Sequence, residues 1–193
     1  MAPHSSVLLI NPNQMQPPVA PIALDYLASS LKDSDYGVDL LDLCFSADIV
    51  SDVRSCFASN SPIVAAITLR NTDDTTFVTR DFFLPRIKNL AECIRGCSDA
   101  PIVLGGSGFS VAPEAVLDFC GVDLGVWGEG ERALPLLVDR ISKDGDYRDV
   151  PGLVYRGKNG FHRNKADYID LDEVPAPRRD TIDNRRYYRE GGM

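Results

Sequence analysis

The sequence predicts an α/β domain in which helices cover both faces of a five-stranded parallel sheet. Two observations lead to this prediction. Short apolar runs alternate with longer stretches of helical periodicity over the first 145 residues, as in chains that wind strand, helix and strand in turn. Hydrophobic residues make up 44% of the 193 positions and charged residues 25%, which are ordinary proportions for a globular protein.

Five apolar runs are the predicted strands. Most of them end at turn-forming residues, and their lengths are typical of strands that are buried on both faces. The runs cover residues 7–10, 38–43, 62–69, 101–104 and 122–127.

The stretches that follow these runs are the predicted helices. The third stretch contains Pro85, so this helix is expected either to kink there or to begin a second segment. Together with the strands the helices make a domain of residues 1–145, whose simplest arrangement is flavodoxin-like. The helical stretches cover residues 21–31, 47–57, 76–97, 113–119 and 129–141.

The pattern changes after residue 145. An extension of residues 146–170 contains two short β-like runs, 152–156 and 161–163, joined by the turn Gly-Lys-Asn-Gly, which predicts a β-hairpin. Residues 171–193 are polar and stiffened by prolines near their start, which predicts an extended linker. We expect this linker to lead toward a further domain.

Charge and composition exclude several classes of protein. The 20 basic and 28 acidic residues give a net charge of −8 without a basic cluster, so a nucleic-acid partner is not expected. No run approaches the roughly 20 apolar residues of a membrane span, and the N-terminus does not resemble a signal peptide. Five cysteines at irregular spacings fit reduced thiols, so we expect a cytoplasmic protein without membrane association.

Cys93 and Cys97 share one face of a predicted helix. A redox or metal pair is one interpretation. Neither a second cysteine pair nor a nearby histidine is present to complete a metal site, so two ordinary thiols are the favoured interpretation.

In an open parallel sheet, ligands bind beyond the carboxyl ends of the strands. The fourth predicted strand ends at Gly105, Gly106, Ser107 and Gly108, where glycines let a ligand approach the backbone closely. Ser107 and Ser110 add hydroxyl groups that can bond to amides, phosphates or ribose. A tight turn without a ligand is the alternative, although three glycines within four residues exceed what such a turn requires.

The fifth predicted strand is followed by Gly-Glu-Gly-Glu at residues 128–131. This run matches the dinucleotide fingerprint G-x-G-x-x-A, but no acidic residue closes a later strand, and Glu129 and Glu131 would repel a pyrophosphate. Carboxylates at a helix N-terminus stabilise the helix and accept hydrogen bonds. The run therefore predicts a ligand that is rich in N–H or hydroxyl donors.

The third predicted strand ends in Thr68, Leu69, Arg70 and Asn71. One interpretation pairs Arg70 with a nearby carboxylate at position 73 or 74, a contact of little energetic weight. The other directs a planar, permanently charged group from the centre of the sheet toward the underside of a large ligand.

Taken together, these motifs resemble the amino-terminal cobalamin-binding domain of the cobalamin-dependent radical SAM enzymes. The pairing of a glycine-rich loop with a GEGE loop one helix later is the most specific part of this resemblance. Within the family, the pattern is most similar to the tryptophan C-methyltransferases of thiopeptide biosynthesis. The matching pieces, in family order over residues 7–180, are VLLINPN, PIALDYLASSL, ITLRNTDD, IVLGGSGFSVAPE, VDLGVWGEGE, VPGLVYRGKNG and LDEVPAPRRD.

The resemblance implies that cobalamin lies on the carboxyl edge of the sheet. Its nucleotide tail is expected beside the glycines and serines at 105–110, with Glu129 and Gly130 near the ribose or the corrin amides. Residues 11 and 12 are expected on the opposite wall. The residues expected to bind the cofactor are Asn11, Pro12, Thr68, Leu69, Arg70, Asn71, Gly105, Gly106, Ser107, Phe109, Ser110, Gly128, Glu129, Gly130 and Glu131.

The sequence departs from other cobalamin modules in one respect. Those modules carry D-x-H-x-x-G after the first strand, and its histidine ligates cobalt, whereas residues 11–21 contain no histidine here. No protein side chain is therefore expected to ligate the metal. Arg70 is the expected catalytic residue, because a guanidinium cannot ligate cobalt but can crowd its lower face and hold it at low coordination number.

By resemblance, the domain belongs to a methyltransferase in which cobalamin accepts a methyl group from S-adenosylmethionine and passes it to a substrate carbon. S-adenosylmethionine, an iron–sulfur cluster and a small-molecule or peptide substrate are expected only in a further barrel domain, because no C-x-x-x-C-x-x-C is present. The parent protein is thus expected to be an enzyme, and this chain alone not to catalyse. The alternatives are a degenerate or non-methylating radical SAM domain and a non-enzymatic flavodoxin-like binding module.

Overall fold

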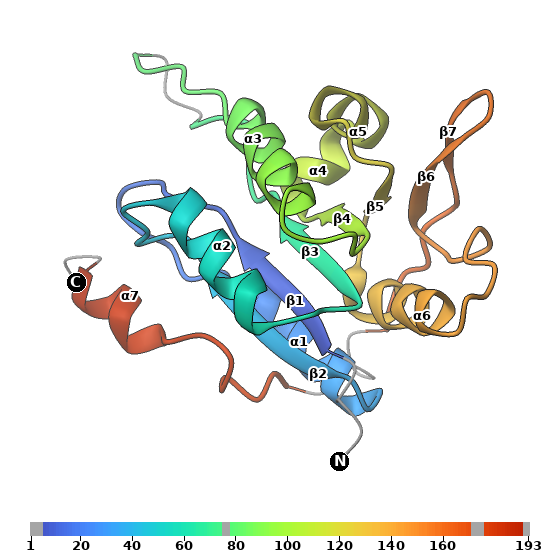
Figure 1. Ribbon diagram of the computed structural model, residues 1–193, viewed down its shortest axis with the longest axis horizontal. Coiled ribbons are helices and arrows are strands. Elements are labelled where there is room, and N and C mark those ends of the chain that lie inside the picture. The colour runs from blue at the N-terminus through green and yellow to red at the C-terminus, as the bar shows by residue number, and fades with distance from the viewer. Residues whose placement is uncertain (1–5, 75–77, 171–175, 191–193) are drawn as a thin grey trace.

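The computed structural model describes residues 6–74, 78–170 and 176–190. Strands and helices alternate along the chain as the sequence predicts, except that two helices follow the fourth strand, and a hairpin and a last helix complete the chain order (Figure 1). In chain order the elements are β1 (Ser6–Asn11), α1 (Ile22–Asp33), β2 (Gly37–Asp42), α2 (Ile49–Ser59), β3 (Val64–Thr68), α3 (Leu84–Arg95), β4 (Ile102–Gly105), α4 (Ser107–Val111), α5 (Pro113–Cys120), β5 (Leu124–Val126), α6 (Gly130–Ser142), β6 (Leu153–Gly157), β7 (Gly160–Arg163) and α7 (Asn184–Glu190).

The strands form one sheet in the order β2-β1-β3-β4-β5-β6-β7. The first five pair in parallel, which confirms the flavodoxin-like arrangement. The hairpin of β6 and β7 is not a separate extension, because it continues the same sheet in antiparallel pairing. β5 spans only three residues, and β6 covers its open edge by pairing Val154 with Gly125. Val154 is fully buried as a result.

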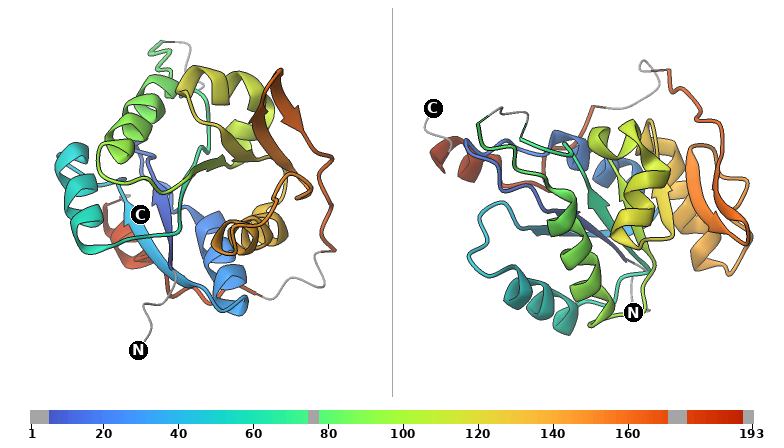
Figure 2. Two further views of the ribbon diagram at one scale, coloured as in Figure 1. Left: turned by 45° about the vertical axis from the view of Figure 1, so that its right-hand side comes forward. Right: turned by 90° about the horizontal axis from the view of Figure 1, so that it is seen from above.

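Helices cover both faces of the sheet, and two apolar clusters hold them there (Figure 2). Side chains alternate along each strand, so that Leu8 and Ile10 of β1 face one cluster and Val7 and Leu9 face the other. The first cluster packs against α2, α3 and α5, and the second against α1 and α6. The central strands are therefore covered on both faces, whereas β2 is only half-buried and β7 is largely exposed.

The predicted helix over residues 76–97 is shorter in the structure. The chain after β3 first folds back on itself, with Asp74 N–H donating to Asp81 O and Phe83 N–H donating to Thr72 O. The helix α3 begins only at Leu84, with Pro85 in its first turn. A proline lacks the N–H that a helix interior requires but suits the first turn, so Pro85 starts the helix instead of kinking it. Residues 75–77 lie outside the described part of the chain.

The predicted linker also differs from expectation within its described residues. Residues 176–183 run along α1, where Arg178 N–H donates to Ser29 Oγ at 3.0 Å and Lys32 Nζ pairs with Asp180 at 2.8 Å. The helix α7 follows, and Ile182 and Tyr187 are buried in the second cluster. Residues 176–190 therefore pack on the domain through these two apolar side chains. We call residues 176–190 the C-terminal strap.

Candidate functional site

A cavity of about 320 Å³ opens between α1, α6 and the strands β1, β3, β4 and β5. Its floor is apolar, with side chains such as Leu9, Leu24, Leu27 and Leu134. Its rim lies at the carboxyl ends of β3, β4 and β5, where the sequence predicts the ligand. The predicted site residues that line it are Thr68, Gly105, Gly106, Ser107, Ser110, Gly128, Glu129, Gly130 and Glu131.

Gly106 shapes the rim at the end of β4. Its φ of 100° is a conformation that side chains rarely adopt, and a Cβ there would lie 2.7 Å from Leu69 O and 2.9 Å from Thr68 Oγ1. The chain can turn here from β4 directly into α4, which replaces the plain loop expected from the sequence. Gly108 N–H then donates to Leu69 O at 2.9 Å and ties α4 to the end of β3.

Ser110 joins the two glycine-containing loops of the rim. Its hydroxyl donates to Gly106 O at 3.1 Å and accepts from Gly128 N–H at 3.0 Å. Ser107 Oγ likewise donates to Arg70 O at 2.7 Å. These serines therefore brace the rim, and each retains acceptor capacity toward a ligand.

Gly130 keeps the cavity open between the two helices. A Cβ at Gly130 would lie 3.0 Å from Leu27 Cδ2 of α1, so a longer side chain would enter the gap. Glu129 lines the cavity, and its Oε2 accepts a hydrogen bond from Ile169 N–H at 2.6 Å. This bond holds the chain that follows the hairpin beside the rim. The glutamate thus has a structural partner in addition to any ligand.

Arg70 lies in a second, smaller hollow of about 30 Å³, which we call the Arg70 groove. Residues 12–14 form one wall, the start of α3 with Phe83 and Arg86 forms the other, and Thr68 borders both the groove and the large cavity. The Arg70 side chain is exposed and forms no ion pair with any residue of the described ranges. The interpretation that pairs it with a carboxylate at 73 or 74 is therefore not supported, whereas Arg86 pairs with Asp81 at 2.5 Å.

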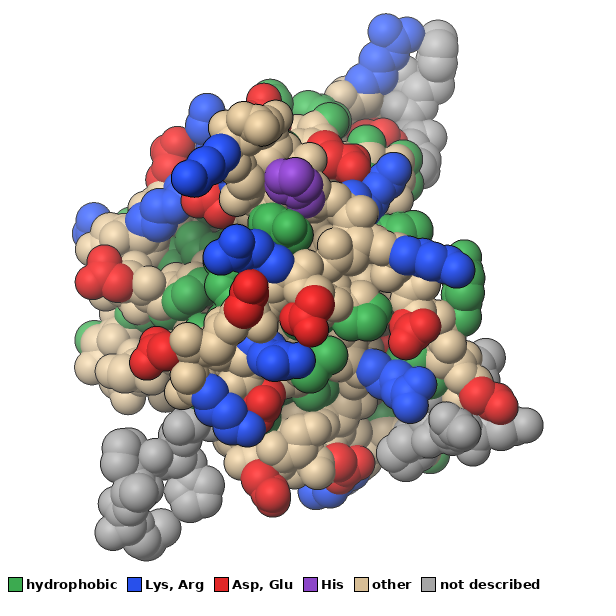
Figure 3. All heavy atoms as spheres, turned by 90° about the vertical axis from the view of Figure 1, so that its right-hand side faces the viewer, with side chains coloured by type: hydrophobic (Ala, Val, Ile, Leu, Met, Phe, Trp, Pro, Cys, Tyr) green, Lys and Arg blue, Asp and Glu red, His purple; other side chains and the backbone are tan. Residues whose placement is uncertain are grey.

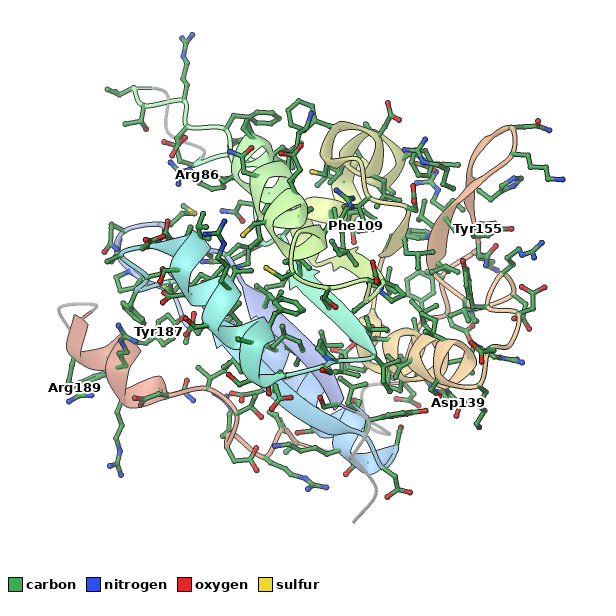
Figure 4. All side chains as sticks on the ribbon, viewed as in Figure 1. Arg86, Phe109, Asp139, Tyr155, Tyr187 and Arg189 are labelled. Atoms are coloured by element: carbon green, nitrogen blue, oxygen red, sulfur yellow. The ribbon has the colours of Figure 1, made fainter. Side chains whose placement is uncertain are left out.

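Two predicted binding residues do not reach either hollow with their side chains. Phe109 is fully buried in the first apolar cluster, where its ring occupies the space that a side chain at Gly125 would take (Figure 4). Asn11 is 1% exposed, and its Nδ2 donates to Asp42 Oδ1 and to Tyr187 OH. The resemblance to the cobalamin-binding domains implied that both bind the cofactor. The turn at Gly106 and the strap direct them inward instead.

The remaining three predicted residues all lie at the Arg70 groove. Pro12 and Asn71 line the Arg70 groove, as does Leu69, although its side chain is buried. Sequence reasoning missed the apolar residues of α1 that line the cavity, and it missed Tyr187. The helical stripe of α1 was visible in the sequence, but which part of it faces a cavity was not.

The interior holds thiols and a phenol whose pKa values are raised. Burial raises the pKa of the Cys120 thiol to about 11, and burial likewise raises the pKa of Cys93. Burial and the neighbouring Asp42 carboxylate raise the pKa of the Tyr187 phenol well above its usual range. All five cysteines are free, and within the described ranges no cluster of histidine, cysteine and acidic residues could hold a metal ion.

The surface shows no field of a single sign on the face that carries the hairpin, where basic and acidic side chains are interspersed (Figure 3). His162 lies on β7, stacked on Tyr155 with ring centroids 5.2 Å apart, and it does not line the cavity or the groove. No helix in the described ranges is long and apolar enough to cross a membrane.

Comparisons with known proteins identify the relatives of this chain. A tryptophan 2-C-methyltransferase of Streptomyces laurentii is 35% identical over 180 residues, which are 91% of this chain and 30% of that protein. The solved structure of the radical S-adenosylmethionine methyltransferase TsrM from Kitasatospora setae, with cobalamin and a 4Fe-4S cluster bound, superposes with a TM-score of 0.88 at 33% identity. It covers 98% of this chain and 38% of that one.

The cobalamin-dependent radical enzyme OxsB shares the fold alone, with a TM-score of 0.70 at 22% identity over 91% of this chain and 24% of that one. The chain thus spans about a third of the length of the curated relative and of TsrM. The family model of the B12 binding domain matches residues 13–138, which include β2 to β5 and both rim loops. This chain is therefore a member of the B12-binding domain family.

Proposed function

We propose that this chain holds cobalamin on the carboxyl edge of its sheet, as the cofactor-binding part of a longer cobalamin-dependent radical SAM methyltransferase. One observation carries the proposal. The rim motifs that match the family also border an apolar cavity between α1 and α6, at the place where open α/β sheets bind ligands.

The residues present fit the cofactor. A cavity of about 320 Å³ is at the small end of ligand pockets, so it suits the nucleotide tail and leaves the corrin outside over the strand ends. Glycine backbone at 105 and 106 allows close approach, and the acceptor oxygens of Glu129 and Glu131 suit the amide fringe of the corrin. Leu24 and Leu134 supply the apolar wall for the tail.

Arg70 is the residue that we propose to lie beside the metal. It stands at the end of the central strand β3, is exposed, and has no described ion-pair partner. A guanidinium stays protonated and does not ligate, so it leaves the metal without a protein ligand on that side. His162, on the distant hairpin, is not placed to replace it.

When bound, cobalamin supplies a carrier for a methyl group between S-adenosylmethionine and a substrate carbon. We assign S-adenosylmethionine, the iron–sulfur cluster and the substrate to the part of the longer protein outside this chain. The similarity to a tryptophan 2-C-methyltransferase supports an indole or a related small molecule or peptide as the substrate. The five free thiols support a place in the cytoplasm.

Titration with hydroxocobalamin tests the proposal, with absorbance and co-elution in gel filtration as readouts. Wild-type chain is expected to retain the coloured cofactor. Gly130→Leu is expected to weaken binding at least about tenfold, because the new side chain enters the gap beside Leu27. Gly121→Asn is the matched control, since a Cβ there meets no atom within 4 Å.

A wild-type chain that stays colourless would falsify the proposal. If Gly130→Leu and wild type bind hydroxocobalamin with equal affinity, the nucleotide tail does not occupy the cavity. The role of Arg70 is tested separately with Arg70→Lys and Arg70→Ala, which are expected to change the absorbance of the bound cofactor and the rate of methyl transfer in the full-length enzyme. Unchanged spectra and rates contradict that role.

A further inference from the structure

A cluster of three polar side chains, two of them buried, joins the C-terminal strap to the ends of the first two strands. Tyr187 OH lies 2.8 and 2.9 Å from the two carboxylate oxygens of Asp42, and Asn11 Nδ2 donates to Asp42 Oδ1 at 2.8 Å and to Tyr187 OH at 2.9 Å. Tyr187 points from α7 toward these strands (Figure 4). Asn11 and Tyr187 are 1% and 5% exposed and Asp42 is half-buried, so the bond between Asn11 and Tyr187 is shielded from water and the bonds to Asp42 are partly shielded.

The cluster continues directly into the loop that walls the Arg70 groove. Asn11 Oδ1 accepts from Asn13 N–H, and Asn13 Oδ1 accepts from Met15 N–H, both at 3.2 Å. Met15 Sδ in turn accepts from Asn71 Nδ2 at 3.6 Å, and Asn71 adjoins Arg70 in the chain. One chain of contacts therefore runs from α7, through the loop of residues 11–15, to the neighbour of Arg70.

The phenol hydroxyl is the part of Tyr187 on which this chain of contacts depends. It donates to a carboxylate and accepts from an amide, so its removal leaves the Asn11 amide with one partner fewer in a buried place. The ring is held independently, because it packs edge-on against Phe45 at a centroid distance of 4.8 Å, with Arg186 over the Phe45 ring at 4.2 Å. Hydroxyl and ring can thus be tested apart.

We propose that Tyr187 is a positioning residue, which acts through Asn11 on the loop of residues 12–14 and so sets the wall of the Arg70 groove. This inference rests on the proposed function for the identity of the ligand. The strap then has a role beyond covering α1. It connects the residues that follow the hairpin to the geometry beside Arg70, although 176 positions separate Asn11 from Tyr187.

The decisive variant is Tyr187→Phe in the full chain, because it removes the hydroxyl and keeps the ring. Hydroxocobalamin affinity is expected to fall about fivefold, the effect of one hydrogen bond of ordinary strength. The absorbance of the bound cofactor is expected to shift, which a change in stability alone does not cause. Tyr188→Phe is the matched control on the same helix, because Tyr188 is 65% exposed, and it is expected to leave both readouts unchanged.

A double-mutant cycle tests the route. If Tyr187 acts through the loop, Tyr187→Phe has little further effect on affinity in an Asn13→Ala background. The Asn13→Ala substitution has then already removed the bond from Met15 N–H to Asn13 Oδ1. Additive effects of the two substitutions contradict the route, and unchanged affinity and spectrum in Tyr187→Phe overturn the inference.

Hydrogen exchange gives a readout that does not depend on cobalamin. The backbone amides of Asn13 and Met15 are expected to exchange about fivefold faster in Tyr187→Phe and at the wild-type rate in Tyr188→Phe. Unchanged protection of these amides overturns the positioning role even if the wild-type chain binds no cobalamin. Failure of the wild type to bind, together with the expected exchange, would instead contradict only the proposed function.

Discussion

The large cavity and the Arg70 groove lie side by side at the same edge of the sheet, with Thr68 between them, but they are built differently. The cavity is bounded by glycine backbone and by apolar side chains of α1 and α6, and its rim is held by the main-chain bond from Gly108 N–H to Leu69 O and by short serine-to-backbone bonds. The groove depends on side-chain hydrogen bonds that link the loop after β1 to the strap.

This difference indicates that the two hollows respond to different changes. Glycine substitutions at the rim distort the cavity directly, because no side chain can rotate away from a backbone clash. Changes in the strap affect the groove and leave the rim intact, since no hydrogen bond joins Tyr187 to the rim loops among the described residues. The predictions below test this separation.

The largest effect is expected from Gly106→Val. The positive φ and the contact of a Cβ with Leu69 O together destabilise the fold by about 4 kcal/mol, the sum of a strained backbone and an overpacked site. Urea unfolding followed by circular dichroism measures this change. Gly121→Asn, a left-handed position with open space, is the control and is expected to stay within about 0.5 kcal/mol of wild type.

Tyr187→Ala is expected to have the second-largest effect, about 3 kcal/mol, because it removes a buried ring and its hydrogen bonds to Asp42. The loss is expected to come with undocking of α7, which limited proteolysis between residues 176 and 190 detects. If the protease cuts Tyr187→Ala no faster than Tyr188→Ala, α7 is not held by this residue.

The third prediction concerns the Cys120 thiol, which lies in the core away from both hollows, and it is tested by measuring the free energy of unfolding at alkaline pH. The folded Cys120 thiol has a pKa of about 11, above that of an unfolded thiol, so the unfolded chain loses this proton first. The stability that comes from the neutral thiol is complete below about pH 9 and is lost as the pH rises toward 11. At pH 10.5 the free energy of unfolding is expected to be lower by about 2 kcal/mol.

Cys120→Ala is expected to remove this part of the pH dependence. Tyr187, whose pKa is also raised, lowers the stability of wild type and of Cys120→Ala equally once the pH exceeds the pKa of an unfolded tyrosine, so the difference between the two proteins reports on the thiol. Parallel curves for wild type and Cys120→Ala would contradict the assignment.

The smallest effect is expected at Asp25, on the face of α1 that turns away from the cavity floor. Asp25 is 1% exposed, and no residue in the described ranges donates a hydrogen bond to its carboxylate. Asp25→Asn replaces a buried ionisable group that has no described partner at nearly constant shape, and it is expected to raise the free energy of unfolding by about 1 kcal/mol. A lower urea midpoint for Asp25→Asn would show that the carboxyl group has a stabilising partner.

The sequence predicts most of the fold and much of the rim correctly, for local reasons. Apolar runs of the right length predict five parallel strands, and glycines directly after two of them predict the two loops that Ser110 joins. The sequence does not predict features that depend on which other segment a strand or loop contacts in the fold. The hairpin was predicted, but only the bare edge of the short β5 decides that it extends the sheet.

The sequence by itself determined the strand ends, the open backbone at Gly105 and Gly106, and the presence of Arg70 at the centre of the edge. Periodicity and glycine placement act over a few residues and are visible in the chain. Only the tertiary structure decided that Phe109 and Asn11 turn inward and that Tyr187 meets Asn11. These contacts join residues far apart in the chain, and packing and buried hydrogen bonding select them, which no local pattern encodes.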